Sequence, residues 1–217
     1  MNNTDIPSTS QKRAREIMGT NMFGVEDAIR HFGVNPSKAQ LAALGEIPFS
    51  EETLSALKTT HVLVAVFPMS ILDIRIRTEV MKDESWKALC NQSWYDGEDF
   101  AKDRGEIGWH LIRKTPVEKS TNKALYEQQP LLGKDDERPK AQVMVYTIIG
   151  HHRAANERLF EEVWVRCSDL DSDSSGVSVG GFDAKGLFVG SYWRSDRIDR
   201  LGLASERRSD FQEASAA

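Results

Sequence analysis

The chain has 217 residues, of which 40% are hydrophobic and 28% are charged, and its formal net charge is −5. With the 15 glycines added, the apolar share is close to the ~45–50% of globular domains, which excludes a disordered or collagen-like chain. The acidic balance makes nucleic acid an unexpected partner, and no apolar run reaches the ~20 residues of a membrane-spanning helix.

The two ends of the chain, residues 1–12 and 209–217, are polar and are predicted to be flexible tails. The N-terminal residues lack the charged, apolar and small-residue regions of a secretory signal peptide. Cys90 and Cys167 lie far apart and form no Cys-x-x-Cys pair, which favours reduced, packed thiols. We therefore expect a cytoplasmic protein.

A helical subdomain is predicted over residues 13–60. Its first clear helix carries an apolar face that ends at Phe32, before Gly33. Asn35-Pro36-Ser37 is typical of a second helix start, and Ser50-Glu51-Glu52-Thr53 of a third.

The segment 25–42 resembles a helix-turn-helix unit, with Gly33 at the turn. Close packing of the two helices would need a small residue four positions before this glycine, where the chain has Ile29. Only Lys38 and Gln40 on the second helix could contact bases or phosphates. A plain helical hairpin is favoured, and DNA binding is the weaker alternative.

An α+β core is predicted over residues 61–208. It opens with residues 61–67, a continuous β-branched run typical of a strand buried on both faces. Residues 71–77 alternate in their second half and favour a half-buried strand. Residues 109–116 form another predicted strand, ended by its proline.

Helices are predicted at three places within this core. Residues 81–105 are expected to be irregular apart from a short helix around 98–102, and a further short helix is expected over 121–132. Residues 141–160 are ambiguous, because their β-branched residues favour a strand. Their length and the apolar residues on one helical face favour a helix, which we adopt.

A three-strand antiparallel meander is predicted at the end of the core, from residues 160–170, 177–182 and 187–193. Asp183-Ala184-Lys185-Gly186 between the last two strands is typical of a hairpin turn. The sequence therefore predicts an α+β fold, in which a helical N-terminal part packs on a mostly antiparallel sheet that ends in this meander.

The turn before the second strand of the meander is a candidate calcium loop. Asp171, Asp173 and Ser175 supply oxygen side chains at the first, third and fifth positions, followed by Gly176. Phe182 stands where an EF-hand has its bidentate carboxylate, and the flanks are predicted strands. A strand-connecting turn without metal explains the same residues.

Histidines and glutamates give the candidate catalytic positions. Glu106 and His110 lie four residues apart, and the pair His151-His152 precedes Glu157. Such groups are suited to general acid–base chemistry or to a zinc site. No His-Glu-x-x-His motif is present, and at most one of two adjacent histidines can face a given site.

Three stretches carry a resemblance to known sequences, Thr60–Pro68, Ser70–Arg75 and Gly108–Pro116. They are similar to conserved hypothetical proteins of uncultivated bacteria, and the similarity covers the chain from about Ala14 to Arg208. The resemblance implies a bacterial, cytoplasmic protein and transfers no functional residues.

Three functions remain open from the sequence. The first is a non-enzymatic binding or assembly protein, with another protein or a second copy as partner, because no group of residues has a recognised catalytic spacing. The second is a hydrolase-like enzyme that uses Glu106, His110 and one of His151 or His152, with or without a divalent metal such as calcium or zinc. The third is DNA binding through residues 25–42.

Overall fold

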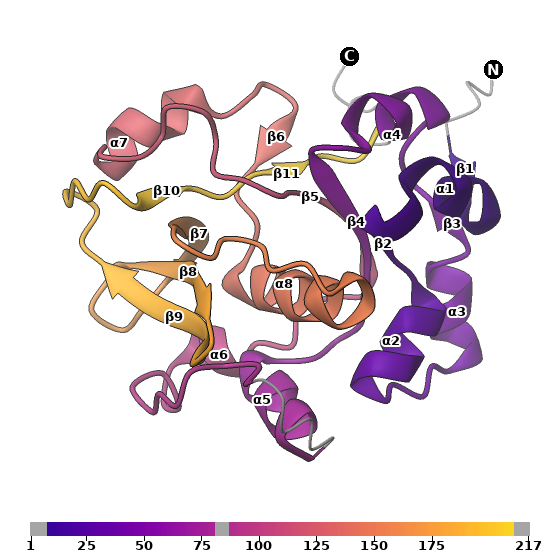
Figure 1. The fold of residues 1–217 in the computed structure, drawn as a ribbon, viewed down its shortest axis with the longest axis horizontal. Coiled ribbons are helices and arrows are strands. Elements are labelled where there is room, and N and C mark those ends of the chain that lie inside the picture. The colour runs from indigo at the N-terminus through magenta and orange to yellow at the C-terminus, as the bar shows by residue number, and fades with distance from the viewer. Residues whose placement is uncertain (1–7, 81–86, 211–217) are drawn as a thin grey trace.

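A computed structural model describes residues 8–80 and 87–210 of the chain as an α+β fold (Figure 1). The helices are α1 (Gln11–Met18), α2 (Val25–Phe32), α3 (Lys38–Ala43), α4 (Glu51–Leu57), α5 (Ile71–Val80), α6 (Asp99–Lys102), α7 (Leu125–Gln128) and α8 (Ala141–Ala155), with short 3-10 turns η1 (Gly19–Asn21) and η2 (Gln129–Leu131). The strands are β1 (Thr9–Ser10), β2 (Met22–Phe23), β3 (Glu46–Ile47), β4 (His61–Val66), β5 (Gly108–Arg113), β6 (Asp136–Glu137), β7 (Trp164–Leu170), β8 (Gly176–Asp183), β9 (Gly186–Tyr192), β10 (Leu201–Leu203) and β11 (Glu206–Arg207).

The strands form two main sheets, where the sequence predicted one. The five-stranded sheet has the order β2-β4-β5-β11-β6, and the four-stranded sheet has the order β10-β7-β8-β9. Within them β2–β4 and β10–β7 are parallel, and the other pairs are antiparallel. The strands β7, β8 and β9 are consecutive antiparallel neighbours, as expected for the meander, and β10 adds a fourth strand beside β7.

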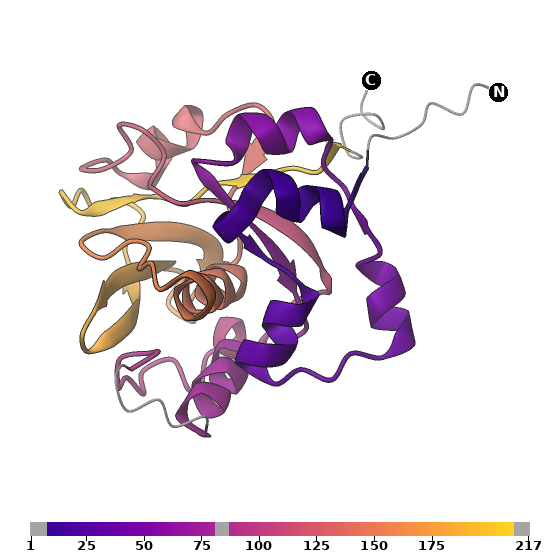
Figure 2. The same ribbon diagram turned by 45° about the vertical axis from the view of Figure 1, so that its right-hand side comes forward.

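Helix α8 lies between the two sheets and is the centre of the core (Figures 1 and 2). It contacts β2 and β4 on one side and β7 and β8 on the other, and every residue from Ala141 to His152 is buried. A helix buried on all sides needs no polar face, which explains why its sequence pattern was ambiguous. Asp169 on β7 caps its first turn by accepting a hydrogen bond from the Ala141 amide at 2.5 Å.

The helical N-terminal part is tied into the same core. Strand β2 pairs in parallel with β4, and the Phe23 ring packs edge-on against Tyr146 of α8. The structure also has β1 paired with β3 and α1 beginning at Gln11, inside the range 1–12 predicted as a tail. Residues 1–7 and 211–217 lie outside the described residues.

The strand predicted at 71–77 is wrong, because these residues belong to helix α5. Ser70 and Asp73 form a capping box: the Asp73 amide donates to Ser70 Oγ and the Ser70 amide donates to Asp73 Oδ2, each at 3.0 Å. Ile71 and Ile74 are buried on the inner side of the helix. The helix predicted over 121–132 is shorter than expected, since only α7 and η2 lie there.

The edge of the four-stranded sheet at β9 is covered by the chain before α6. The Cys90 amide donates to the Leu187 carbonyl at 3.0 Å, and the Leu187 amide donates to the Ala88 carbonyl at 2.9 Å. Farther along, the Gln92 side chain pairs with both backbone groups of Val189, at 3.1 and 3.0 Å. An amide side chain therefore takes the place of a neighbouring strand at this position.

Strand alternation divides the functional side chains of the five-stranded sheet between its two faces. Cross-strand pairing places Glu206 opposite Ile112 and Arg207 opposite Leu111. Glu206 therefore shares the α8 face with His110, while Arg207 shares the opposite face with Arg113. Among the residues described, no helix is long and apolar enough to cross a membrane.

Candidate functional site

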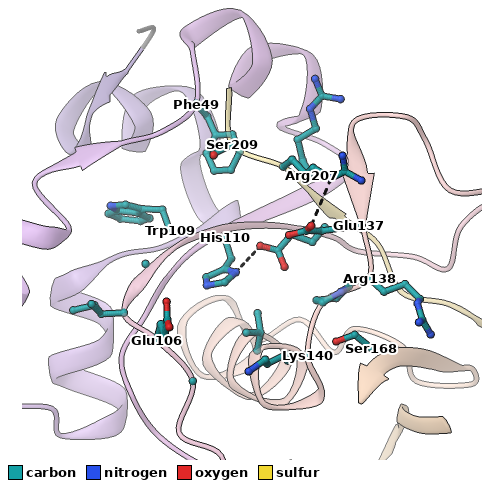
Figure 3. Close-up of a pocket in the computed structure, with 17 residues that line it drawn as sticks. Phe49, Glu106, Trp109, His110, Glu137, Arg138, Lys140, Ser168, Arg207 and Ser209 are labelled. Carbon is teal, nitrogen blue, oxygen red and sulfur yellow. Dashed lines mark hydrogen bonds and ion pairs between the residues drawn. The ribbon is translucent and has the colours of Figure 1, made fainter. Parts of the chain in front are cut away.

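A pocket of about 560 Å³ opens where β5, β11 and the start of α8 meet (Figure 3). Its polar walls come from segments far apart in the sequence, which only the sheet brings together. The ionisable residues that line it are Glu106, His110, Glu137, Arg138, Lys140, Glu206, Arg207 and Arg208. The pocket has the size of a small-molecule site.

A histidine–carboxylate pair lies in this pocket. His110 Nδ1 is 2.5 Å from Glu206 Oε1, although the two residues are 96 positions apart in the sequence. Glu206 is only 8% exposed, because β11 lies between β5 and β6. A carboxylate oxygen accepts hydrogen bonds, so Nδ1 of His110 is the donor in this pair and Nε2 is the ring nitrogen left for a ligand.

The other ring nitrogen of His110, Nε2, lies beside Gly108, where an added Cβ would be at an ordinary contact distance of 3.7 Å. The His110 side chain is 23% exposed. No hydrogen bond joins Nε2 to any residue in 8–80 or 87–210. Glu106 lines the same pocket and, within these ranges, its carboxylate has neither an ion pair nor a hydrogen bond.

The remaining charges at the pocket are used within the protein. Lys140 pairs with Asp103 at 2.7 Å, and this hydrogen bond raises the pKa of the lysine. Glu137 faces the pocket in Figure 3 and pairs with Arg208 at 3.5 Å. Arg138 donates to the Cys167 carbonyl at 3.0 Å. His110 Nε2 and the Glu106 carboxylate therefore remain as the groups available to a ligand.

The predicted histidines His151 and His152 lie elsewhere. Val143 of α8 lines the pocket, and His151 is two turns farther along the helix, about 12 Å at 1.5 Å per residue. His151 is 1% exposed, its Nε2 is 2.9 Å from Glu157, and burial lowers its pKa. His152 packs edge-on against Phe182. The structure thus brings together Glu106 and His110 and separates them from the other two.

The predicted calcium loop makes its contacts within the protein. Asp171 Oδ1 accepts hydrogen bonds from the amides of Asp173 at 3.0 Å and Ser175 at 2.8 Å, and Oδ2 accepts one from Ser191 Oγ. These bonds organise the turn between β7 and β8. Across the described residues, no group of three or more His, Cys, Asp or Glu side chains is placed to hold a metal ion.

The segment 25–42 is divided between different neighbours. Helix α2 packs on α8, β4 and α5, and its last carbonyls accept hydrogen bonds from Arg77 of α5. Helix α3 has no buried residue, and its Leu41 is 44% exposed. The small residue that packs tightly is Ala28, fully buried toward the core, while Ile29 faces out. DNA binding through this segment gains no support from this arrangement.

Comparison with protein-family models, curated proteins and solved structures finds no match to the chain. The candidate site therefore rests on geometry alone. The sequence predicted Glu106 and His110 as candidates but not Glu206, which begins the two-residue strand β11 near the C-terminal end and belongs to no spacing motif. Only the pairing of β11 with β5 reveals it.

Proposed function

We propose that this pocket is the active site of a hydrolase-like enzyme, with His110 as the general base. The observation that carries the proposal is the His110–Glu206 pair: a buried carboxylate holds one ring nitrogen, and the other ring nitrogen is open to the pocket. This is the arrangement in which a carboxylate fixes the tautomer and orientation of a catalytic imidazole.

The chemistry assigned to each residue follows from its position. His110 Nε2 takes a proton from a water molecule as the water oxygen bonds to the substrate, and the imidazolium then returns this proton to the leaving group. Glu206 stabilises the imidazolium through Nδ1. Glu106 accepts a hydrogen bond from the same water and orients it. A positioned base of this kind contributes about 10²–10⁴-fold to a rate.

The test is a panel of small chromogenic carboxylic and phosphoric esters at pH 7.5, with three variants. We expect His110→Gln to lower kcat/KM by about 10²–10⁴-fold and Glu206→Gln to lower it less, since Nε2 remains. His31→Gln is the matched control, because this histidine lies on α2 outside the pocket, and it should leave the rate unchanged.

Equal rates in all four proteins, or no hydrolysis of any ester by the wild type, would refute the proposal. The same panel can be followed by NMR at the His110 ring. A ligand that shifts the His110 signals without being hydrolysed would instead favour a non-enzymatic binding protein, the first of the functions expected from the sequence.

A further inference from the structure

A second cavity, of about 420 Å³, lies on the opposite face of the five-stranded sheet, beneath helix α4. Its polar lining comes from α4 and from four strands of the sheet: Glu52, Thr53, His61, Arg113, Asp136 and Arg207. Because side chains alternate along β5 and β11, Arg113 and His110 are on different sides of the sheet. Arg207 lines both pockets, but His110, Glu206 and Glu106 do not line this one, so an inference about it is independent of the proposed function.

Arg113 is the unusual group in this cavity. Its side chain forms no hydrogen bond or ion pair with any residue in the described part of the chain, and its Nε atom is buried. Leaving a buried N–H donor without an acceptor is unfavourable. Such a cost calls for an explanation from function.

The groups around Arg113 do not neutralise it. Arg207 adds a second guanidinium to the lining, and it pairs with Asp135 at 2.9 Å. Asp136 accepts a hydrogen bond from Ser205 Oγ at 3.2 Å, and Glu52 lines the cavity as an exposed residue of α4. Neither carboxylate is within ion-pair distance of Arg113.

The pKa of His61 reflects the same excess of positive charge. It is 4% exposed and lies directly across from Arg113 in the β4–β5 pair. Burial, followed by the charges of Arg113 and Arg207, lowers its pKa to about 4. An anion in the cavity would offset the positive charge of both guanidinium groups and would change the electrostatic environment of the His61 ring.

We propose that the cavity binds the oxyanion group of a small metabolite, a phosphate or a carboxylate, with Arg113 as its principal donor. The edge formed by the two terminal nitrogens of a guanidinium matches two oxygens of either group. The terminal nitrogens of Arg113 are not among its buried atoms. Arg207 contributes a second positive charge from the neighbouring strand. The volume accommodates a small molecule rather than a polymer.

The test measures thermal stability in HEPES with increasing inorganic phosphate or acetate, at an ionic strength kept constant with sodium chloride. A ligand that binds only the folded protein raises Tm progressively with its concentration. We expect such a rise in the wild type and in the control Arg194→Met, whose exposed side chain lies outside the cavity. We expect no rise in Arg113→Met.

The two anions distinguish the two possible ligand groups. A rise at lower concentrations of phosphate than of acetate indicates a phosphorylated ligand, and the reverse order indicates a carboxylate. As a second readout, the binding anion should shift the NMR signals of the His61 ring in the wild type and leave those of His151 unchanged.

The proposal is overturned if neither anion changes Tm, or if Arg113→Met responds as the wild type does. A purely structural Arg113 would make Arg113→Met less stable in chloride alone. We expect instead that this variant is at least as stable as the wild type, since an apolar side chain replaces an unsatisfied buried group. Arg113→Lys keeps the charge without the bidentate edge and should respond to the anion more weakly than the wild type.

Discussion

Acidification should destabilise this protein through His61. The imidazole titrates near 6.5 when exposed and near 4 when folded, because of its burial and the nearby Arg113 and Arg207. The unfolded chain therefore binds the proton more tightly, so the stability that His61 contributes is complete above pH 6.5 and is lost as the pH falls toward 4. The two pKa values correspond to a loss of about 2 kcal/mol by pH 5.

The assay is urea unfolding at pH 8 and at pH 5 in buffers that contain only chloride as anion. The wild type should lose about 2 kcal/mol more than His61→Gln between the two pH values. Buried His151 has its pKa lowered as well, but it is present in both proteins, so its contribution cancels in the comparison. If wild type and His61→Gln lose the same free energy of unfolding, the assigned environment of His61 is wrong.

Two further substitutions, Gly186→Ala and Arg166→Met, test the packing, and Gly97→Ala is the control for the first. Gly186→Ala should destabilise the protein by about 1–3 kcal/mol, because φ is 108° and the new Cβ would lie 2.5 Å from the Leu89 carbonyl carbon. Gly97→Ala, with no atom within 4 Å of its Cβ position, should change the free energy of unfolding by under about 0.5 kcal/mol. If urea unfolding shows the same loss for Gly97→Ala and Gly186→Ala, the close approach of Leu89 to Gly186 does not determine stability. Arg166→Met should destabilise the protein by roughly 1–3 kcal/mol for each buried acceptor that it leaves without a donor. Arg166 is 1% exposed and donates to the carbonyls of Lys123, Trp193 and Asp196. If the variant melts at the same temperature as the wild type, these hydrogen bonds do not contribute to stability.

Local sequence signals predicted much of the fold. The strand at 61–66 and the meander were correct because β-branched runs and hairpin turns act over a few residues. The strand predicted at 71–77 was wrong because the alternation of Ile74 and Ile76 with Arg75 and Arg77 outweighed the capping box of Ser70 and Asp73. Helix propensity is weak evidence when two periodicities compete over so few residues.

The pairing of strands that are distant in the sequence could not be predicted from local sequence patterns. Glu206 lies beside His110, and Arg207 lies near Arg113, only because β11 inserts between β5 and β6. His61 lies across from Arg113 because β4 pairs with β5. Nothing in the last residues of the chain distinguishes a strand of two residues from a charged tail. Residues of the candidate site were therefore found singly, and their partners came from the sheet order.

The side chain of Gln92 has a consequence for the behaviour of the protein in crowded solution. A sheet edge with free amide and carbonyl groups is a template on which another chain can add a strand and begin an aggregate. At Val189 both groups are already occupied by one glutamine side chain. The Trp94 indole N–H also donates to the Val189 carbonyl at 3.0 Å, and the backbone of residues 88–90 covers the edge at Leu187. Resistance to aggregation at this edge therefore depends on a few residues far from either cavity.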